Sequence, residues 1–226
     1  MVDEYYINLE KYPLEKFKHE LKESELLPSR RILKEQINER FKILEDKGVK
    51  NLQYLLISLK TPAKCREFAK KSNIPEDYLL ILRREVNSYI PKPVNLENFP
   101  GIEKDNIKKL NNIEIKNTAH LFKRIKTEKD RKELSSETGI NYEKIMELTK
   151  LTDLSRIKWI GPIFARVFFE SGTDTPLKVS DSDAEFLYKK LVQINKEKGY
   201  AKGKFIESDV ELCIKVSKMV PKAIEY

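Results

Sequence analysis

Cysteine, histidine and glycine are all scarce in this sequence of 226 residues. Two cysteines, Cys65 and Cys213, cannot form a disulfide framework or a structural zinc site by themselves, and they suit a reducing setting. The two histidines, His19 and His120, have no second metal ligand at helical spacing. No phosphate-binding loop, dinucleotide fingerprint, nucleophile elbow or zinc-protease motif occurs. We therefore predict a non-enzymatic protein without a metal, a cofactor or a small-molecule substrate.

Long apolar runs are also missing. No stretch of 18 apolar residues occurs, so we expect no membrane-spanning helix and no membrane partner. The first ten residues have neither a basic start nor an apolar core, so we expect no secretory signal. Together these absences predict a soluble, cytoplasmic protein.

Charged residues, in contrast, are abundant. Lys and Arg number 44 and Asp and Glu number 36, which gives a net charge of +8. A basic balance suits an anionic partner, most simply the backbone of DNA or RNA. A solvated helical surface with interspersed Lys and Glu gives the same composition, so a scaffold that binds another protein is the alternative.

Apolar residues recur at three- and four-residue steps, and the alternating pattern of a β-strand is absent. This periodicity predicts an all-α fold. The segment Pro91-Lys92-Pro93-Val94 disfavours helix and predicts an extended linker. The expected divisions are an N-terminal arm at 1–28, a first helical repeat unit at 29–90, a linker at 91–95 and a tandem helical domain at 96–226, with units of about 96–150 and 151–226.

The chain repeats itself at an offset of 66 residues. Phe41–Leu82 aligns without a gap with Ile107–Leu148, and ten of these 42 pairs are identical, where roughly three would arise by chance. Thr61 and Thr127 are expected to cap equivalent helices. Cys65 lies opposite Arg131, and we expect this position at the surface or at a rim. A weaker third copy, offset by 58 residues, places Leu96–Leu110 over Leu154–Phe168.

Two stretches resemble the helix-hairpin-helix motif, namely Leu96–Lys104 and Leu154–Arg166. In this motif an apolar residue plugs the joint between two helices. Its glycines let backbone amides at the start of the second helix meet a phosphate. Each stretch lacks one glycine, because Glu103 replaces the second and Trp159 replaces the first. The hairpins are therefore either phosphate contacts or structural joints. We expect Trp159 to fill the joint, and an exposed stacking platform is the alternative.

From about Leu96 to Tyr226 the chain resembles an uncharacterised domain-of-unknown-function family built from tandem helix-hairpin-helix, SAM-like units. The matching features are Arg131–Leu134 with Thr138–Ile140, Leu148–Trp159, Ala184–Lys198 with Leu191–Asn195, and Val216–Pro221. Residues 27–93 resemble the N-terminal extension of longer members. The resemblance implies tandem helical units with an N-terminal helical extension, and it implies no activity.

These features predict sequence-independent nucleic-acid binding through hairpin amides and basic helix faces. We expect Lys158 and Arg166 to be exposed beside Gly161, so that their charges favour an anion there. The predicted contact residues are Gly101, Lys104, Lys158, Gly161, Ile163 and Arg166 at the hairpins, and Lys64, Lys126, Lys129 and Arg131 on basic strips at equivalent places in the two copies. Hairpins with a purely structural role, in a scaffold for protein partners, remain the alternative.

Overall fold

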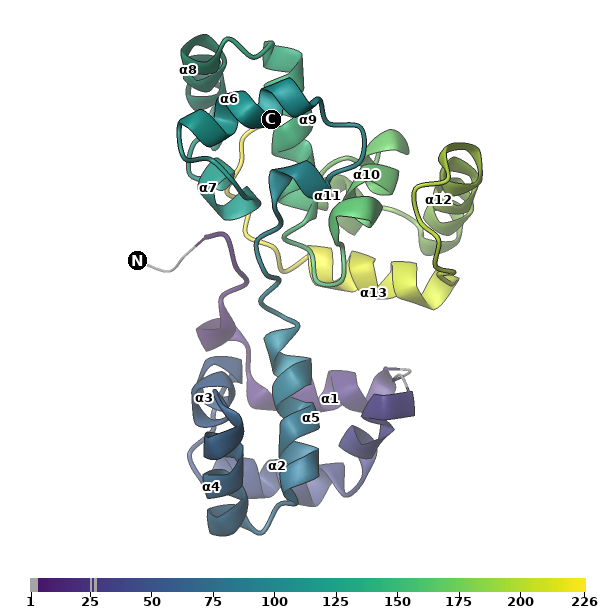
Figure 1. The fold of residues 1–226 in the computed structure, drawn as a ribbon. Coiled ribbons are helices and arrows are strands. Elements are labelled where there is room, and N and C mark those ends of the chain that lie inside the picture. The colour runs from purple at the N-terminus through teal and green to yellow at the C-terminus, as the bar shows by residue number, and fades with distance from the viewer. Residues whose placement is uncertain (1–3, 25, 27) are drawn as a thin grey trace. The chain divides into compact units, whose positions relative to one another are not determined.

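The computed structural model describes residues 4–24, 26 and 28–226, and every regular element within them is a helix (Figure 1). Two isolated β-bridges are the only other pairing in this part of the chain. The predicted all-α fold is confirmed. None of the described helices combines the length and the apolar character needed to cross a membrane.

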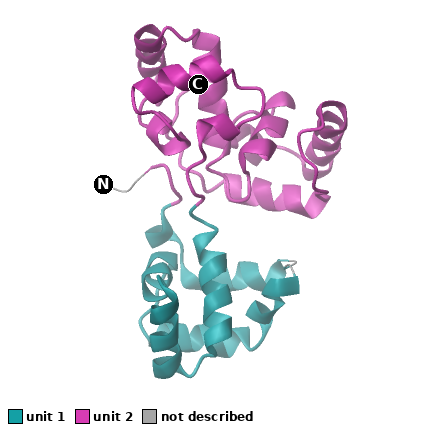
Figure 2. Ribbon diagram, viewed as in Figure 1, with its two compact units in different colours: residues 1–2, 8–90 teal, residues 3–7, 91–226 magenta. Residues whose placement is uncertain are grey.

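The chain forms two compact units (Figure 2). The first unit contains Asn8–Ile90, and the second contains Pro91–Tyr226 together with residues 4–7. The first unit is therefore an insertion in the second, and the chain passes between the units twice, after Ile7 and after Ile90. The second passage falls at the start of the expected linker.

The first unit is built from short helices around one apolar core. Its elements are η1 (Leu9–Lys11), α1 (Leu14–Glu23), η2 (Pro28–Lys34), α2 (Ile37–Asp46), α3 (Leu52–Ser58), α4 (Pro62–Ser72) and α5 (Glu76–Asn87), where η denotes a 3-10 helix. Phe17 of α1 is buried, and its ring centroid lies 6.0 Å from that of Phe41 and 5.7 Å from that of Tyr89. Part of the segment that we expected to be an arm thus belongs to this core.

The second unit is organised around one central helix. Its elements are η3 (Leu96–Asn98), α6 (Lys104–Asn112), α7 (Thr118–Phe122), α8 (Glu128–Thr138), α9 (Tyr142–Leu154), α10 (Pro162–Glu170), α11 (Pro176–Ser180), α12 (Ala184–Lys198) and α13 (Glu207–Ser217). Helix α9 packs against α7, α8 and α10, and Leu148, Leu151 and Leu154 on it are buried. A helix covered on several sides needs little amphipathic pattern.

The same order of elements occurs in both units at the 66-residue offset. Helices α4 and α8 have 11 residues each and follow the N-caps Thr61 and Thr127. The side chains of Asn51 and Asn117 likewise cap α3 and α7. At an offset of 58 residues, α10 and α11 repeat the bounds of α6 and α7. Local capping chemistry therefore sets the helix starts in each copy.

The first described residues of the chain complete the second unit. Tyr5 is only 2% exposed, and its hydroxyl lies 2.6 Å from Thr118 Oγ1. The buried guanidinium of Arg156 donates from Nε to the carbonyl oxygen of Tyr5 at 3.1 Å and from Nη2 to that of Pro221 at 2.8 Å. It also forms an ion pair with Asp153, whose pKa is raised by burial. One buried cation thus joins three distant stretches of chain.

Candidate functional site

The turn between α9 and α10 has a glycine-like backbone at a position occupied by tryptophan. Trp159 has a φ of 70°, close to the 80° of Gly101 in the turn before α6. A residue with a Cβ is strained in this left-handed region. The joint is filled by Ile160, which is buried, whereas Trp159 is 45% exposed. The expectation that Trp159 fills the joint is therefore wrong.

Helix α10 begins with two backbone amides that have no acceptor among the described residues. Its N-cap, Gly161, has no side chain to accept them, and Pro162 has no N–H. The amides of Ile163 and Phe164 lie in the first turn, where an α-helix offers no internal acceptor. No acidic residue lies in that turn, so no side chain there compensates the positive end of the helix dipole.

The two cations expected beside this turn are buried. Lys158 is 1% exposed, and its Nζ lies 3.9 Å from the centroid of the Trp159 ring. The side chain of Arg166 is 3% exposed, with Nη2 at 2.7 Å from Glu147 Oε1 and Nη1 at 3.5 Å from Glu170 Oε1. The expectation that Lys158 and Arg166 are exposed is wrong, because these side chains point inward and Arg166 finds carboxylates there. Neither can reach a phosphate at the surface.

The turn before α6 differs in its charge. Gly101 is exposed, and a Cβ built on it would lie 3.7 Å from Arg166 Nη2, so this turn rests on the buried guanidinium. Glu103 is the N-cap of α6 and forms an ion pair with Lys144 at 3.2 Å. Its carboxylate brings a negative charge to the start of α6, which disfavours a phosphate there. Lys104 is exposed and has no ion-pair partner in the described part of the chain.

The residues of the basic strips are largely engaged within the protein. Lys126 Nζ lies 2.5 Å from a carboxylate oxygen of Glu4. Lys129 Nζ lies 3.7 Å from Glu133 Oε1, one turn further along the same helix. Arg131 is only 1% exposed, and its Nη1 donates to the carbonyl oxygen of Ile125 at 3.0 Å. Its predicted surface contact is therefore wrong. The opposite residue in the repeat, Cys65, is buried as well, so this position belongs to the core in both units.

Lys64 belongs to the first unit, whereas the other predicted contact residues belong to the second. Its side chain is exposed, and Nζ donates to the carbonyl oxygen of Ile57 at 3.4 Å. The side chain thus reaches the last turn of helix α3, and its positive charge is open to solvent.

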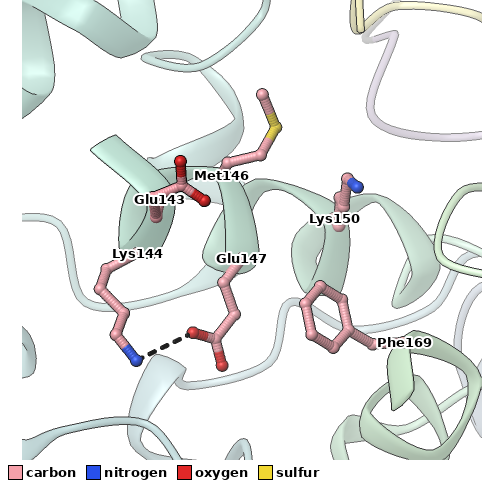
Figure 3. A pocket seen from close by; sticks show the side chains of 6 residues that line it. All are labelled: Glu143, Lys144, Met146, Glu147, Lys150 and Phe169. Carbon is pink, nitrogen blue, oxygen red and sulfur yellow. Dashed lines mark ion pairs between the residues drawn. The ribbon is translucent and has the colours of Figure 1, made fainter. Parts of the chain in front are cut away.

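A hollow of about 260 Å³ lies between α9 and α10 (Figure 3). Its lining residues are Glu143, Lys144, Met146, Glu147, Lys150 and Phe169. Lys144 Nζ lies 3.5 Å from a Glu147 oxygen, and Lys150 Nζ lies 2.6 Å from Asp174 Oδ2. Burial acts to raise the pKa of Asp174, but hydrogen bonds from Lys150 and Lys178 lower it overall. Internal pairing thus neutralises much of the charge around the hollow.

Among the described residues, no group of three or more His, Cys, Asp or Glu side chains could hold a metal ion.

The sequence did not predict the buried ion pair between Asp153 and Arg156. The available signal is its position, since both charged residues lie between Leu148 and Ile160, where a Leu or Ile recurs at every third position.

Residues 100–218 match the model of a protein family described as a domain of unknown function (DUF4332). The matched region includes Gly101, Trp159 and Gly161, and therefore both turns described above. No curated protein and no solved structure matches the chain.

Proposed function

The chain belongs to the family of the domain of unknown function DUF4332, and we propose that it binds the backbone of nucleic acid without reading its sequence. In this proposal the turns before α6 and α10 are helix-hairpin-helix turns, and the turn before α10 makes the contact. The phosphate accepts hydrogen bonds from the amides of Ile163 and Phe164. Such a contact holds the backbone and carries no base specificity.

A single observation carries the proposal, namely the uncapped and acid-free start of α10. Neighbouring helices contrast with it, because Asn117, Thr175 and Asp183 cap α7, α11 and α12 with their own side chains. The turn before α6 also lacks a side-chain cap, but Glu103 supplies a negative charge there. Of these two turns, only the one before α10 has open amides and no carboxylate beside them.

The overall charge supports the same partner. The net charge of +8 favours association with a polyanion at low salt. Lys104 and Lys64 remain from the predicted set as exposed lysines without an ion-pair partner among the described residues. The free, buried cysteines Cys65 and Cys213 suit a reducing compartment, and we place the protein in the cytoplasm on this ground.

The test replaces Gly161 by Asp. Gly161 has φ −77° and ψ 179°, which any residue adopts, and a Cβ there would meet no atom within 4 Å. The new carboxylate should cap α10 as Asp183 caps α12, which keeps or slightly raises stability. It would also occupy the amides. We expect a loss of affinity of about ten- to a hundredfold, the worth of a hydrogen bond to a charged group.

Fluorescence anisotropy with labelled DNA and RNA, repeated over a range of salt concentrations, measures this loss. The parent should show a log–log salt slope of about −0.9 for each phosphate neutralised on duplex DNA. Gly203→Asp is the matched control, because it makes the same charge change at an open position between α12 and α13. Equal weakening by both variants would show diffuse attraction and refute a site at α10.

A protein scaffold is the second candidate, and the position of Arg166 favours it. This buried guanidinium lies against Gly101 and pairs with Glu147, so it fixes the turn before α6 to α10. Such packing is what a purely structural hairpin requires. If no nucleic acid binds even at low salt, the protein scaffold is the candidate that remains.

A further inference from the structure

Trp159 is the only tryptophan in the chain, and it occupies a costly position. Its backbone is left-handed, where the equivalent residue of the preceding turn is Gly101. Its side chain is nevertheless 45% exposed, so contacts within the protein account for only part of its surface. Strained residues at exposed turns are more often found at functional sites. The indole is therefore the feature of this turn that packing explains least.

The indole has one covered side and one exposed part, and an apolar residue lies near it. Lys158 is buried, and its ammonium lies 3.9 Å from the centroid of the indole. The indole therefore covers the ammonium group of Lys158, and the remaining part of the indole faces solvent. Ile163, four residues further on, is also exposed and adds apolar surface at the start of α10. Exposed aromatic side chains are the platforms on which proteins that bind single-stranded nucleic acid stack bases.

The distance to the open amides suits one nucleotide. Pro162, the first residue of α10, is three residues after Trp159, so at most about 11 Å of chain separates them. A base stacked on the indole can thus belong to the same strand segment as a phosphate at Ile163 and Phe164. Bases inside a duplex are already stacked on one another and cannot reach the indole.

We propose that the α10 turn prefers single-stranded nucleic acid, with one unpaired base stacked on Trp159. This inference rests on the proposed function, because the phosphate contact positions the strand. Glycine at this position would let a backbone approach but would offer no platform. Tryptophan keeps a nucleic-acid backbone further away but offers a ring on which a base can stack. Proteins that bind single strands use such stacking without sequence preference.

The experiment uses the full chain and two measurements. The fluorescence of Trp159 in the parent reports on this one place, and the anisotropy of end-labelled probes gives the affinity of the parent and of every variant. The probes are a short single-stranded oligoadenylate, the same strand with abasic sugars, and the matched duplex. Trp159→Gly is the test variant. Glycine adopts a φ of 70° without strain, which opposes the loss of the contact between the indole and Lys158, and the melting temperature of each variant is measured beside its affinity. Trp159→Phe keeps a ring, and Tyr54→Ala removes another exposed aromatic side chain as a control.

We expect the single strand to quench the fluorescence and to bind about tenfold more weakly to Trp159→Gly, a typical effect of losing one stacked base. Trp159→Phe should retain most of the affinity, and Tyr54→Ala should retain all of it. The abasic strand should bind the parent as weakly as the intact strand binds Trp159→Gly. The duplex should bind the parent and Trp159→Gly with the same affinity.

Two other outcomes are distinguishable. If single strand and duplex bind equally, without quenching, and Gly161→Asp still weakens both, the stacking inference is overturned and the backbone contact stands. If no probe binds even at low salt, the proposed function fails and this inference fails with it.

Discussion

Tyr5 gives the sharpest test of the division into two units, because it precedes the first unit in sequence but is buried in the second. Its ring packs edge-on against Phe122, with centroids 5.3 Å apart, and its hydroxyl meets Thr118. Truncation of a buried aromatic side chain typically costs about 3–5 kcal/mol. Tyr5→Ala should therefore destabilise the second unit by about 3 kcal/mol and leave the first unit unchanged.

Native-state thiol labelling with peptide mass analysis measures both units at once. Cys65 lies in the first unit and Cys213 in the second, and both are buried. Burial raises the pKa of Cys213 to about 12 and also raises the pKa of Cys65, so labelling requires opening. A loss of 3 kcal/mol corresponds to labelling of Cys213 that is roughly 150-fold faster.

Tyr5→Phe is the matched control, because it keeps the ring and removes only the hydroxyl. It should cost about 1 kcal/mol, or roughly fivefold in labelling of Cys213. Equal acceleration at Cys65 and Cys213 in Tyr5→Ala would refute the assignment of this segment to the second unit alone. An unchanged rate at Cys213 would show that the segment contributes nothing to that core.

Buried and capping groups give three further predictions. Arg166→Glu places a carboxylate beside Glu147 and should lower the melting temperature by roughly 10 °C or more; an unchanged melting curve would contradict the buried pair. Asp174 has a lowered pKa in the folded state, so its stabilisation is present above the unfolded value near 3.8 and is lost as pH falls through the folded value. The difference in urea midpoint between the parent and Asp174→Asn should shrink in acid, and a widening difference would count against it. Asn117→Ala removes the hydrogen bond from the His120 amide and should cost about 1 kcal/mol in urea unfolding, whereas Asn117→Asp should cost much less.

Helix positions could be predicted from the sequence because their signals are local. Thr61 and Thr127 mark the starts of α4 and α8 in the sequence itself, and Asn51 and Asn117 mark α3 and α7 in the same way. Apolar periodicity supplied the core positions of most helices. Neither signal requires knowledge of a distant residue.

The candidate site could be located from the sequence, but its electrostatics could not. Formal charge places every lysine and arginine at the surface, whereas Arg131, Arg156 and Arg166 are buried. Their compensation comes from carbonyl groups and carboxylates that only the tertiary fold brings near. The left-handed backbone of Trp159 could not be predicted either, because glycine is the residue that signals this conformation in a sequence.

The insertion of the first unit also fixes an order of events during synthesis. Tyr5 leaves the ribosome early, but Arg156, which donates to its carbonyl oxygen, follows 151 residues later. At about 5–20 residues per second this delay is roughly 8–30 s. Asn8–Ile90 is complete long before then and can fold within the nascent chain. The first described residues must therefore wait, with the aromatic ring of Tyr5 exposed, until the chain has been made at least as far as Thr118 and Phe122, and their backbone waits longer still for Arg156.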